Sequence, residues 1–172
     1  MDFSLRPAQP ADFAAIAELT MDVYRDLLPS IPGAQEYLEK MRDVQGRAEQ
    51  SELLAAVDNV TGQVLGAVSF VLPGTPYANL AVPGEGEFRL LAVASAAQGR
   101  GVGEALVRAC LDRALSLGLH RVVLHTQSNM LAAQRLYGRL GFVRVPERDR
   151  AVTPDFALWA YSVDLKEAVA AD

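Results

Sequence analysis

Several kinds of chemistry are scarce in this sequence, and each scarcity excludes a class of protein. One cysteine, Cys110, rules out a disulfide within the chain, and the two histidines stand at spacings unrelated to that thiol, so we expect no bound metal. No uninterrupted apolar run approaches the roughly 18 residues that a membrane-spanning helix needs, so we expect no membrane association. Residues 1–12 lack the apolar stretch of a signal peptide, which makes the cytoplasm the expected location.

An excess of positive charge is missing as well. Lys and Arg total 16 against 21 Asp and Glu, and the resulting net charge of −5 offers no basic surface to a phosphate backbone. We therefore expect no nucleic-acid partner. The 172 residues are 51% hydrophobic and 22% charged, which is ordinary for a globular protein, so we predict a single domain over residues 1–172.

The most informative segment reads Gln98-Gly99-Arg100-Gly101-Val102-Gly103. It lies between an apolar, strand-like run at residues 88–93 and a helix predicted over residues 102–117 from its apolar periodicity. The first turn of a helix has backbone N–H groups without intrahelical partners and the positive end of the helix dipole, and glycines leave those groups uncovered. The segment therefore predicts a site for a phosphorylated cofactor.

The spacing of the glycines excludes two common phosphate-binding motifs. A Walker loop needs Lys and then Ser or Thr after its last glycine, whereas Glu104 and Ala105 follow Gly103 here. A dinucleotide fingerprint needs Gly or Ala where Glu104 stands, and an acidic ribose partner about 20 residues later, where the sequence has residues 119–121, Leu-His-Arg. Nucleotide hydrolysis and dinucleotide binding are therefore both disfavoured.

Periodicity and turn residues predict an ordered series of elements. We expect a strand at residues 3–6, a helix capped by Asp12 and running to about 27, a break at 28–33, and a second helix at 34–49. A hairpin of strands 53–57 and 64–72 with a turn at 58–62 follows, then an irregular loop at 73–86 and the strand at 88–93. After the helix at 102–117, ended by Gly118, we expect a strand at 122–124, a helix at 130–140 capped by Ser128 or Asn129, and strands at 142–145 and 156–163 joined by a charged link at 146–154.

The element order and two motifs resemble the GNAT superfamily of N-acetyltransferases. The first motif is Leu91-Ala92-Val93 followed by Gln98, Gly101 and Gly103, and the second is Asn129 with Tyr137 and the closing pair Gly141-Phe142. The resemblance covers essentially the whole chain. It implies an α/β (α+β) fold: a mixed, mostly antiparallel sheet with a central parallel βαβ unit and helices on both faces.

The resemblance also implies an acetyl-CoA-dependent transferase that moves an acetyl group to a primary amine of a small molecule or peptide by direct transfer in a ternary complex. Tyr137 would direct its hydroxyl at the cofactor sulfur, and Glu87 or a water chain would take the proton of the amine. The acceptor would approach from residues 24–33 and 73–86, which makes Tyr24, Arg25 and Tyr77 weak specificity candidates. The expected cofactor-binding residues are Leu91, Ala92, Val93, Gln98, Gly99, Arg100, Gly101, Val102, Gly103 and Asn129.

Each of these residues also has a purely structural interpretation. The glycines could only make a tight turn, Asn129 could only cap a helix, and the ring of Tyr137 could simply pack in the core. Glu87 alternates with apolar neighbours, as polar residues do on the solvent-facing side of any strand. Cys110 falls on the apolar face of its helix, where a thiol is usually inert.

Two other functions stay open: a non-catalytic acyl-CoA sensor, and an acetyltransferase of protein N-termini or lysines. The identity of the amine, the preferred acyl-CoA and the choice between monomer and homodimer do not follow from the sequence.

Overall fold

The computed structural model describes residues 2–25, 32–154 and 156–165, which form two compact units. The first unit contains the residues up to 70 together with 89–109, and the second contains 71–88 and the residues from 110 onward. Two strands, β3 (Val64–Val71) and β4 (Glu85–Val93), and one helix, α4 (Val102–Ser116), pass from one unit into the other. The number of domains stays a prediction.

The first unit contains four strands, with the helices that precede and follow them. Its elements are β1 (Phe3–Pro7), a 3-10 turn (Pro10–Asp12), α1 (Phe13–Tyr24), α2 (Ala34–Arg42), α3 (Val44–Gln50), β2 (Glu52–Asp58), β3 (Val64–Val71), the end of β4 (Glu85–Val93), a 3-10 turn η2 (Ser95–Ala97) and the start of α4 (Val102–Ser116). The strand order in this unit is β1-β2-β3-β4.

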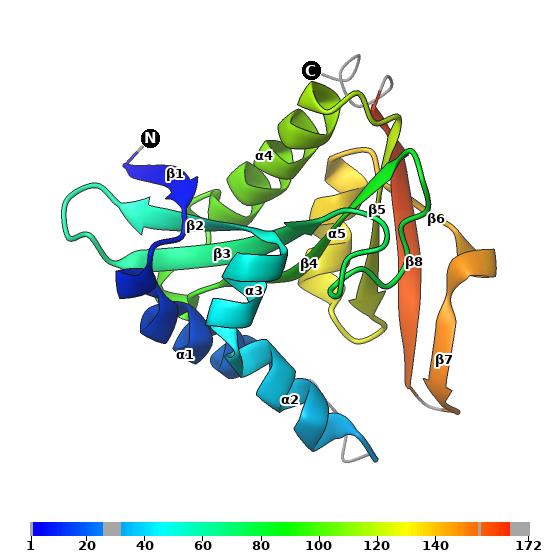
Figure 1. The fold of residues 1–172 in the computed structure, drawn as a ribbon, viewed down its shortest axis with the longest axis horizontal. Helices are drawn as coiled ribbons and strands as arrows, with labels where there is room; N and C mark the ends of the chain where they lie inside the picture. Colours follow the sequence, from blue (N-terminus) through cyan, green and yellow to red (C-terminus); the bar gives the residue numbers. More distant parts are fainter. Residues whose placement is uncertain (1, 26–31, 155, 166–172) are drawn as a thin grey trace. The chain divides into compact units, whose positions relative to one another are not determined.

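The predicted hairpin is confirmed as β2 and β3, which pair antiparallel and lie side by side in Figure 1. Asp58 begins the turn, and its carboxylate accepts the N–H groups of Val60 and Thr61 at 2.8 and 2.9 Å. Gly62 completes the turn with φ of +74°, a conformation that glycine adopts without steric cost. The turn residues thus fix the register of the two strands.

The single helix predicted over 34–49 is wrong, because the chain forms α2 and α3 with a break at Asp43. The Asp43 side chain accepts the N–H of Gly46, so it caps a new helix instead of continuing the old one. Asp12 does precede α1, but its carboxylate pairs with Arg6 and accepts the N–H of Gln9 rather than capping the helix. The end predicted for that first helix, at about residue 27, lies outside the described residues.

The second unit holds the other half of the sheet. Its elements are the start of β4, the end of α4, β5 (Arg121–Gln127), α5 (Leu131–Arg139), β6 (Val143–Arg144), a 3-10 turn η3 (Pro146–Arg148), β7 (Arg150–Thr153) and β8 (Phe156–Asp164). The strand order is β4-β5-β8-β6, with β7 also paired to β8. In Figure 1, β5 and β8 run alongside each other.

Strands β4 and β5 are parallel, with Glu85 opposite Arg121 and Glu87 opposite Val123. The pairs β1·β2, β2·β3, β5·β8, β6·β8 and β7·β8 are antiparallel. The predicted fold class, a mixed and mostly antiparallel sheet with a parallel βαβ unit, is therefore confirmed.

Several boundaries differ from the prediction in this unit. The link predicted at residues 146–154 contains β7, and β4 begins at Glu85 instead of 88. Leu115, one of the apolar residues in the helix predicted at 102–117, is 39% exposed. Neither Ser128 nor Asn129 caps α5, because the N-cap position is Met130, and Gln134 instead reaches back to the carbonyls of Gln127 and Ser128.

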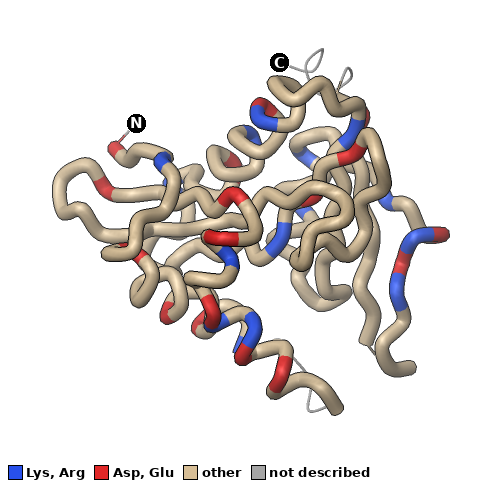
Figure 2. The backbone as a smooth tube through the Cα atoms, in the orientation of Figure 1, with Lys and Arg blue, Asp and Glu red and all other residues tan. Residues whose placement is uncertain are grey.

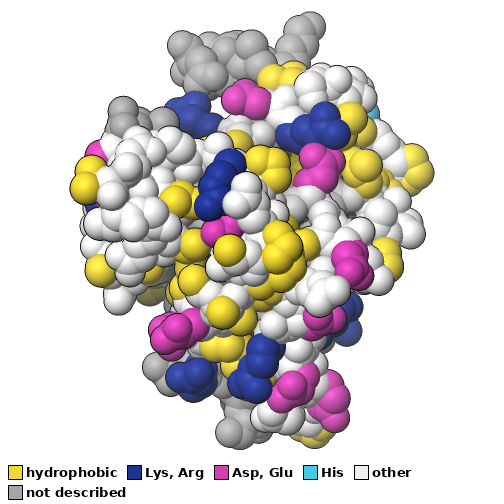
Figure 3. Space-filling view, turned by 60° about the vertical axis from the view of Figure 1, so that its left-hand side comes forward, with side chains coloured by type: hydrophobic (Ala, Val, Ile, Leu, Met, Phe, Trp, Pro, Cys, Tyr) yellow, Lys and Arg dark blue, Asp and Glu magenta, His cyan; other side chains and the backbone are white. Residues whose placement is uncertain are grey.

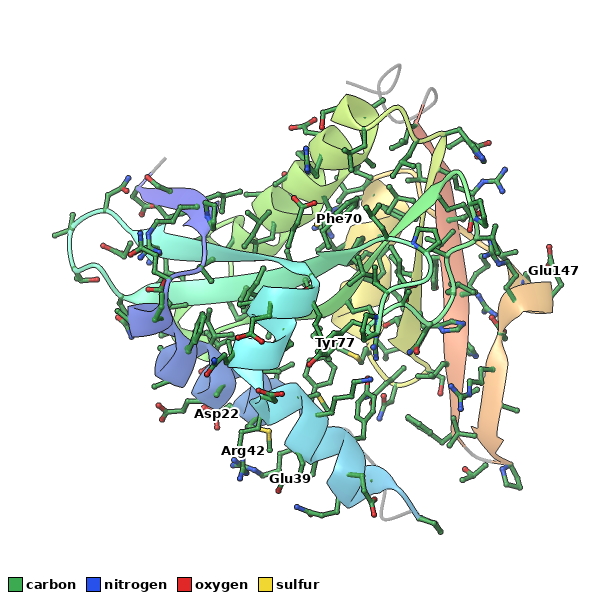
Figure 4. The ribbon with its side chains drawn as sticks, viewed as in Figure 1. Asp22, Glu39, Arg42, Phe70, Tyr77 and Glu147 are labelled. Atoms are coloured by element: carbon green, nitrogen blue, oxygen red, sulfur yellow. The ribbon has the colours of Figure 1, made fainter. Side chains whose placement is uncertain are left out.

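Within the described ranges, none of the helices is both long and apolar enough to cross a bilayer. Acidic and basic residues are interspersed along α2 in Figure 2, and acidic and basic side chains also lie near one another on the face of the molecule shown in Figure 3. Figure 4 labels one such pair, Glu39 and Arg42, whose Oε1 and Nη1 atoms are 3.9 Å apart.

Candidate functional site

The glycine segment makes the predicted strand-to-helix turn in the first unit. Gly99 and Gly101 have φ of +83° and +81°, and a Cβ added to either would meet no heavy atom within 4 Å. Their missing side chains therefore leave open space on the surface of the turn, while the left-handed backbone opposes any other residue type. This is the geometry that a main-chain cradle for a ligand needs.

The start of α4 supplies the hydrogen-bond donors of that turn. At the start of this helix, the N–H of Ala105 donates to the carbonyl of Gly101 at 3.0 Å. By helix geometry, the N–H groups of Val102, Gly103 and Glu104 then have no acceptor within the helix. They carry the positive end of the helix dipole, which favours an anionic group such as a diphosphate.

Close packing holds this turn against the sheet of the same unit. A Cβ at Gly66 of β3 would come within 2.9 Å of Val102 and 3.0 Å of the Ala92 carbonyl oxygen, so glycine lets the start of α4 approach the strands. On the other side, Arg100 forms ion pairs with Asp2 and Asp58, at 3.0 and 3.1 Å.

These contacts raise the pKa of Arg100, chiefly through the hydrogen bond to Asp58, and two backbone N–H groups and Arg100 lower the pKa of Asp58 to about 2. The Nη2 atom of Arg100 is thus engaged by two carboxylates of its own unit, while its Nε atom is buried with no partner among the described residues.

One edge of β4 is bonded to side chains at the residues predicted to hold the cofactor. The Tyr24 hydroxyl donates to the Leu91 carbonyl at 3.0 Å, and Gln98 Nε2 donates to the Val93 carbonyl at 3.4 Å. The N–H of Ala94 donates instead to the carbonyl of Leu65 in β3, so the backbone groups of alternate residues point to opposite edges of the strand. Because N–H and C=O of one strand residue point to the same side, the N–H groups of Leu91 and Val93 point to the edge that carries Tyr24 and Gln98.

Leu90, just before this edge, has a left-handed backbone with φ of +57°. A branched, non-glycine residue adopts this conformation at a cost of roughly 1–3 kcal/mol, and such strain concentrates at functional sites. It interrupts the regular pleat of β4 at the point where the edge begins. Gln98, which bonds the Val93 carbonyl and stands at the start of the glycine segment, connects this edge to the turn within the first unit, whereas Ala92 is buried.

Burial raises the pKa of Tyr24 strongly, while its nearby charges act in opposite directions. The hydroxyl therefore stays protonated and keeps donating to Leu91. Arg25, the next residue, lies on the surface 3.8 Å from Asp22. Residues 26–31 of the predicted acceptor loop lie outside the described residues.

Glu87 lies in the second unit and is fully buried. Its Oε1 atom accepts the N–H groups of Asn79, Leu80 and Ala81 at 2.9–3.1 Å, whereas Oε2 accepts one weaker bond from Asn79 at 3.4 Å. The carboxylate therefore holds the loop before β4 in place. Only Oε2 has acceptor capacity left for other chemistry.

Tyr137 also lies in the second unit, where its ring packs into an aromatic cluster. The ring centroids of Phe88, Phe142 and Tyr161 are 5.7, 5.8 and 6.0 Å from that of Tyr137. The ring of Tyr137 thus packs in the core, and the hydroxyl is the part of the side chain that could act on a ligand. Asn129 follows the end of β5, and Tyr77, labelled in Figure 4, is buried in the loop before β4.

The carboxyl end of β5 carries polar atoms that sequence reasoning mostly missed. His125 Nδ1, Thr126 Oγ1 and Gln127 Oε1 are buried and have no hydrogen-bond partner among residues 2–25, 32–154 and 156–165. Leaving one such atom unsatisfied costs about 1–3 kcal/mol, and more than nine in ten buried backbone groups and most side-chain ones avoid it. The sequence contains one signal for these polar atoms: within a single buried strand, the apolar residues Val-Val-Leu are followed by the polar residues His-Thr-Gln.

A family model describes the sequence over both units. The model of the acetyltransferase (GNAT) family matches residues 14–142, which is more than half of the chain. The chain belongs to the GNAT acetyltransferase family. This family uses acetyl-CoA, so the resemblance carried by the glycine turn and the Tyr137 motif is confirmed at the level of the family.

Curated relatives match shorter stretches. The mycothiol acetyltransferase of Mycobacteroides abscessus is 47% identical over 60 residues, which is 35% of this chain and 20% of that protein. The mycothiol acetyltransferase of Renibacterium salmoninarum is 36% identical over 91 residues, which is 53% of this chain and 26% of that protein. The chain thus spans about a fifth to a quarter of the length of these relatives.

Solved GNAT structures match along nearly the whole chain. A GCN5-related N-acetyltransferase from Kribbella flavida is 26% identical with a TM-score of 0.68, covering 95% of this chain and 98% of that one. The protein yncA of Salmonella typhimurium, solved with its cofactor acetyl-CoA, is 24% identical with a TM-score of 0.64, covering 100% and 99%. An acetyltransferase of the family from Staphylococcus aureus Mu50 has a TM-score of 0.71 at 11% identity, covering 95% and 99%. The likeness of the last two shows the fold alone.

Proposed function

We propose that this chain transfers the acetyl group of acetyl-CoA to a primary amine of a small molecule or peptide, directly and within a ternary complex. The observation that carries the proposal is the glycine turn. Gly99 and Gly101 leave open space in front of the α4 N-terminus, and the uncovered N–H groups of Val102 and Gly103 suit a diphosphate. The acceptors of the mycothiol acetyltransferases do not carry over, because the match spans a small part of those proteins.

The residues of the first unit fit this cofactor. The main chain of residues 98–103 would hold the diphosphate, and the β4 edge at Leu91 and Val93 would bind the pantetheine arm. Bound acetyl-CoA supplies the acetyl group as an activated thioester. The edge N–H groups would also donate to the thioester oxygen, where negative charge develops during transfer.

Two residues of the second unit are proposed to handle protons. An alkylammonium with a pKa near 10.4 is only about 0.04% neutral at pH 7, so its proton needs an acceptor. We assign that role to Glu87, through Oε2 or a water chain, because Oε1 is saturated by backbone N–H groups. Tyr137 would hydrogen-bond the departing sulfur and keep its own proton, since a phenol is a weaker acid than a thiol.

Burial of Cys110 supports direct transfer. Its side chain is fully buried in α4, so the one thiol of the chain is not positioned to attack a bound thioester. As the amine nitrogen bonds to the acetyl carbon, the carbon–sulfur bond breaks, and the amine loses one proton while the thiolate gains one. No acyl-enzyme is required.

Calorimetry with acetyl-CoA, followed by a panel of primary amines with detection of released thiol, tests the proposal. We expect saturable binding and amine-dependent thiol release, with release reduced about 10- to 100-fold in Tyr137→Phe. Binding without release for any amine would favour the acyl-CoA sensor. An absence of binding at millimolar acetyl-CoA would contradict the cofactor assignment, and acetylated Cys110 in a mass spectrum would contradict direct transfer.

A further inference from the structure

The polar end of β5 presents two hydrogen-bond acceptors on one face of the sheet. In a strand, alternate side chains share a face, so Val123, His125 and Gln127 point the same way. Parallel pairing of Val123 with Glu87 puts Glu87 on that face too. We call this surface of the second unit, made by Glu87, Val123, His125 and Gln127, the Glu87 face. Thr126 points to the opposite face, where its cross-strand neighbour is Trp159.

The contacts of His125 define which of its ring nitrogens is an acceptor. Its Nε2 atom lies 3.0 Å from the carbonyl oxygen of Arg148. A carbonyl can only accept, so Nε2 carries the hydrogen, and in the neutral ring Nδ1 then presents a lone pair. That Nδ1 atom is buried and has no partner in the part of the chain that the structure describes.

Gln127 adds a second acceptor on the same face. Its side chain is 4% exposed, and its Oε1 atom is also without a partner among the described residues. Residues two apart in a strand have Cα atoms about 7 Å apart, so both side chains can reach one small group between them. Two unsatisfied acceptors, on residues two apart on one face of β5, call for a ligand that brings N–H groups.

Arg148, whose carbonyl contacts His125, has a guanidinium that is already paired. Arg148 donates to both carboxylate oxygens of Glu85, at 2.9 and 3.0 Å, and to the carbonyl of Leu80. Its guanidinium is therefore turned toward Glu85, whereas Glu147, the preceding residue of η3, is exposed and labelled at the outer end of that turn in Figure 4. The guanidinium of Arg148 is thus directed to Glu85 and Leu80 instead of to His125 or Gln127.

We propose that His125 Nδ1 and Gln127 Oε1 bind the amino group of the acceptor, each accepting one of its N–H groups. The pair would hold a primary amine on the Glu87 face, where the carboxylate proposed to take its proton also lies. This inference rests on the proposed function and adds to it the residues that select a nitrogen with at least two N–H groups. An acceptor with a hydroxyl or thiol brings one hydrogen and would leave one of the two atoms unsatisfied.

Nitrogen NMR of 15N-histidine-labelled protein tests the pair without any need for activity. The chain has two histidines, so the spectrum contains two rings, and His125→Phe identifies the signals of His125. We expect Nδ1 of His125 to be unprotonated and to shift saturably on addition of methylammonium chloride. Tetramethylammonium has the same charge but no N–H groups, so it should leave the signal in place. A proton on Nδ1, no response to methylammonium, or equal responses to the two cations would overturn the proposal.

Two variants of Gln127 sharpen the test. Gln127→Met keeps the length of the side chain and removes the acceptor, so the methylammonium midpoint should rise about 10-fold. Gln127→Glu keeps an acceptor oxygen and should bind at least as tightly as the native protein. Equal midpoints for the two variants would contradict a role for Oε1, and if both fail to fold, the titration of the native protein still decides.

The outcome is separable from that of the proposed function. Loss of the methylammonium response with intact acetyl-CoA binding would overturn the amine site alone, whereas failure of acetyl-CoA to bind would overturn the cofactor assignment and leave the amine site standing.

Discussion

The glycine turn of the first unit and the Glu87 face of the second unit are built in opposite ways. The turn offers main-chain N–H groups, and its key residues contribute by having no side chain. The Glu87 face offers side-chain oxygens and a ring nitrogen, held on buried strands. A main-chain site leaves a glycine pattern that can be recognised in the sequence, whereas a side-chain site becomes visible only when the strand register and the hydrogen bonds are known.

The largest expected effect comes from removing a side chain on which the second unit depends. Glu87→Leu leaves the buried N–H groups of Asn79, Leu80 and Ala81 without their acceptor. We expect the free energy of unfolding to fall by about 3–5 kcal/mol and the melting temperature by roughly 10 °C, measured by calorimetry.

Glu87→Gln is the matched control, because its amide oxygen can still accept those N–H groups. It should keep most of the stability, so a loss of acetyl transfer in this variant would report the proton-accepting role alone. A melting temperature of Glu87→Leu within a degree or two of the native value would show that the loop does not depend on Glu87.

The corresponding change in the first unit is the addition of one methyl group to the turn. Gly101→Ala places a Cβ in the open space and strains a backbone with φ of +81°. We expect acetyl-CoA to bind at least about 10-fold more weakly by calorimetry, because the main chain can no longer approach the diphosphate.

Gly118→Ala has nearly the same strain, with φ of +75° and open space, at the far end of α4. It should lose similar stability and keep its affinity for acetyl-CoA. If both variants weaken binding equally, the turn is a structural feature and not a cradle.

A third glycine, Gly138, tests a position where the backbone does not require glycine. Gly138 lies inside α5 with ordinary helical backbone, and a Cβ there would meet no atom within 4 Å. Gly138→Ala should stabilise the protein by about 1 kcal/mol and raise the melting temperature by about 2–4 °C. A fall in melting temperature would contradict this, and a loss of transfer at unchanged stability would show that the neighbouring Tyr137 needs a flexible helix.

The smallest effect should come from the ion pair beside the turn. The pKa of Asp58 is lowered from 3.8 to about 2 by two backbone N–H groups and Arg100, so the folded state favours the charged form. Its contribution is complete above about pH 4 and is lost as the pH falls toward 2. The melting temperatures of the native protein and Asp58→Asn should therefore differ slightly at pH 6 and converge by pH 2. A gap that is constant over this range would contradict the assignment, and a large gap would mean that side chains carry more of the turn than we infer.

The fold was largely predictable because its signals are local. The hairpin follows from Asp58 and Gly62, and α4 follows from its apolar period and Gly118, which has the left-handed φ of a helix end. The break at Asp43 was missed because Asp is tolerated within helices as well as at caps, and the outcome depends on whether its side chain turns to Gly46. Strand β7 was missed because four residues in a charged link become a strand only through pairing with β8.

The residues of the candidate site also divide into those with a local signal in the sequence and those that depend on the fold. The residues of the turn and of the edge at Leu91 and Val93 were predicted by motif, and Gln98 connects the two through its bond to Val93. Glu87 was predicted from its type, but its bonds to the loop before β4 could not be, because residues 79–81 reach it only through the fold. Gln127 was not predicted at all. Its Oε1 atom has no hydrogen-bond partner among the described residues, and that depends on which residues the fold places around it and not on its residue type.

The burial of Cys110 has a practical consequence for measuring this enzyme. A thiol-reactive dye added to the native protein should colour only with the coenzyme released, since the chain's own sulfur is enclosed within α4. The same dye added after denaturation should gain one equivalent per chain. That equivalent gives an internal count of the protein present in every turnover assay.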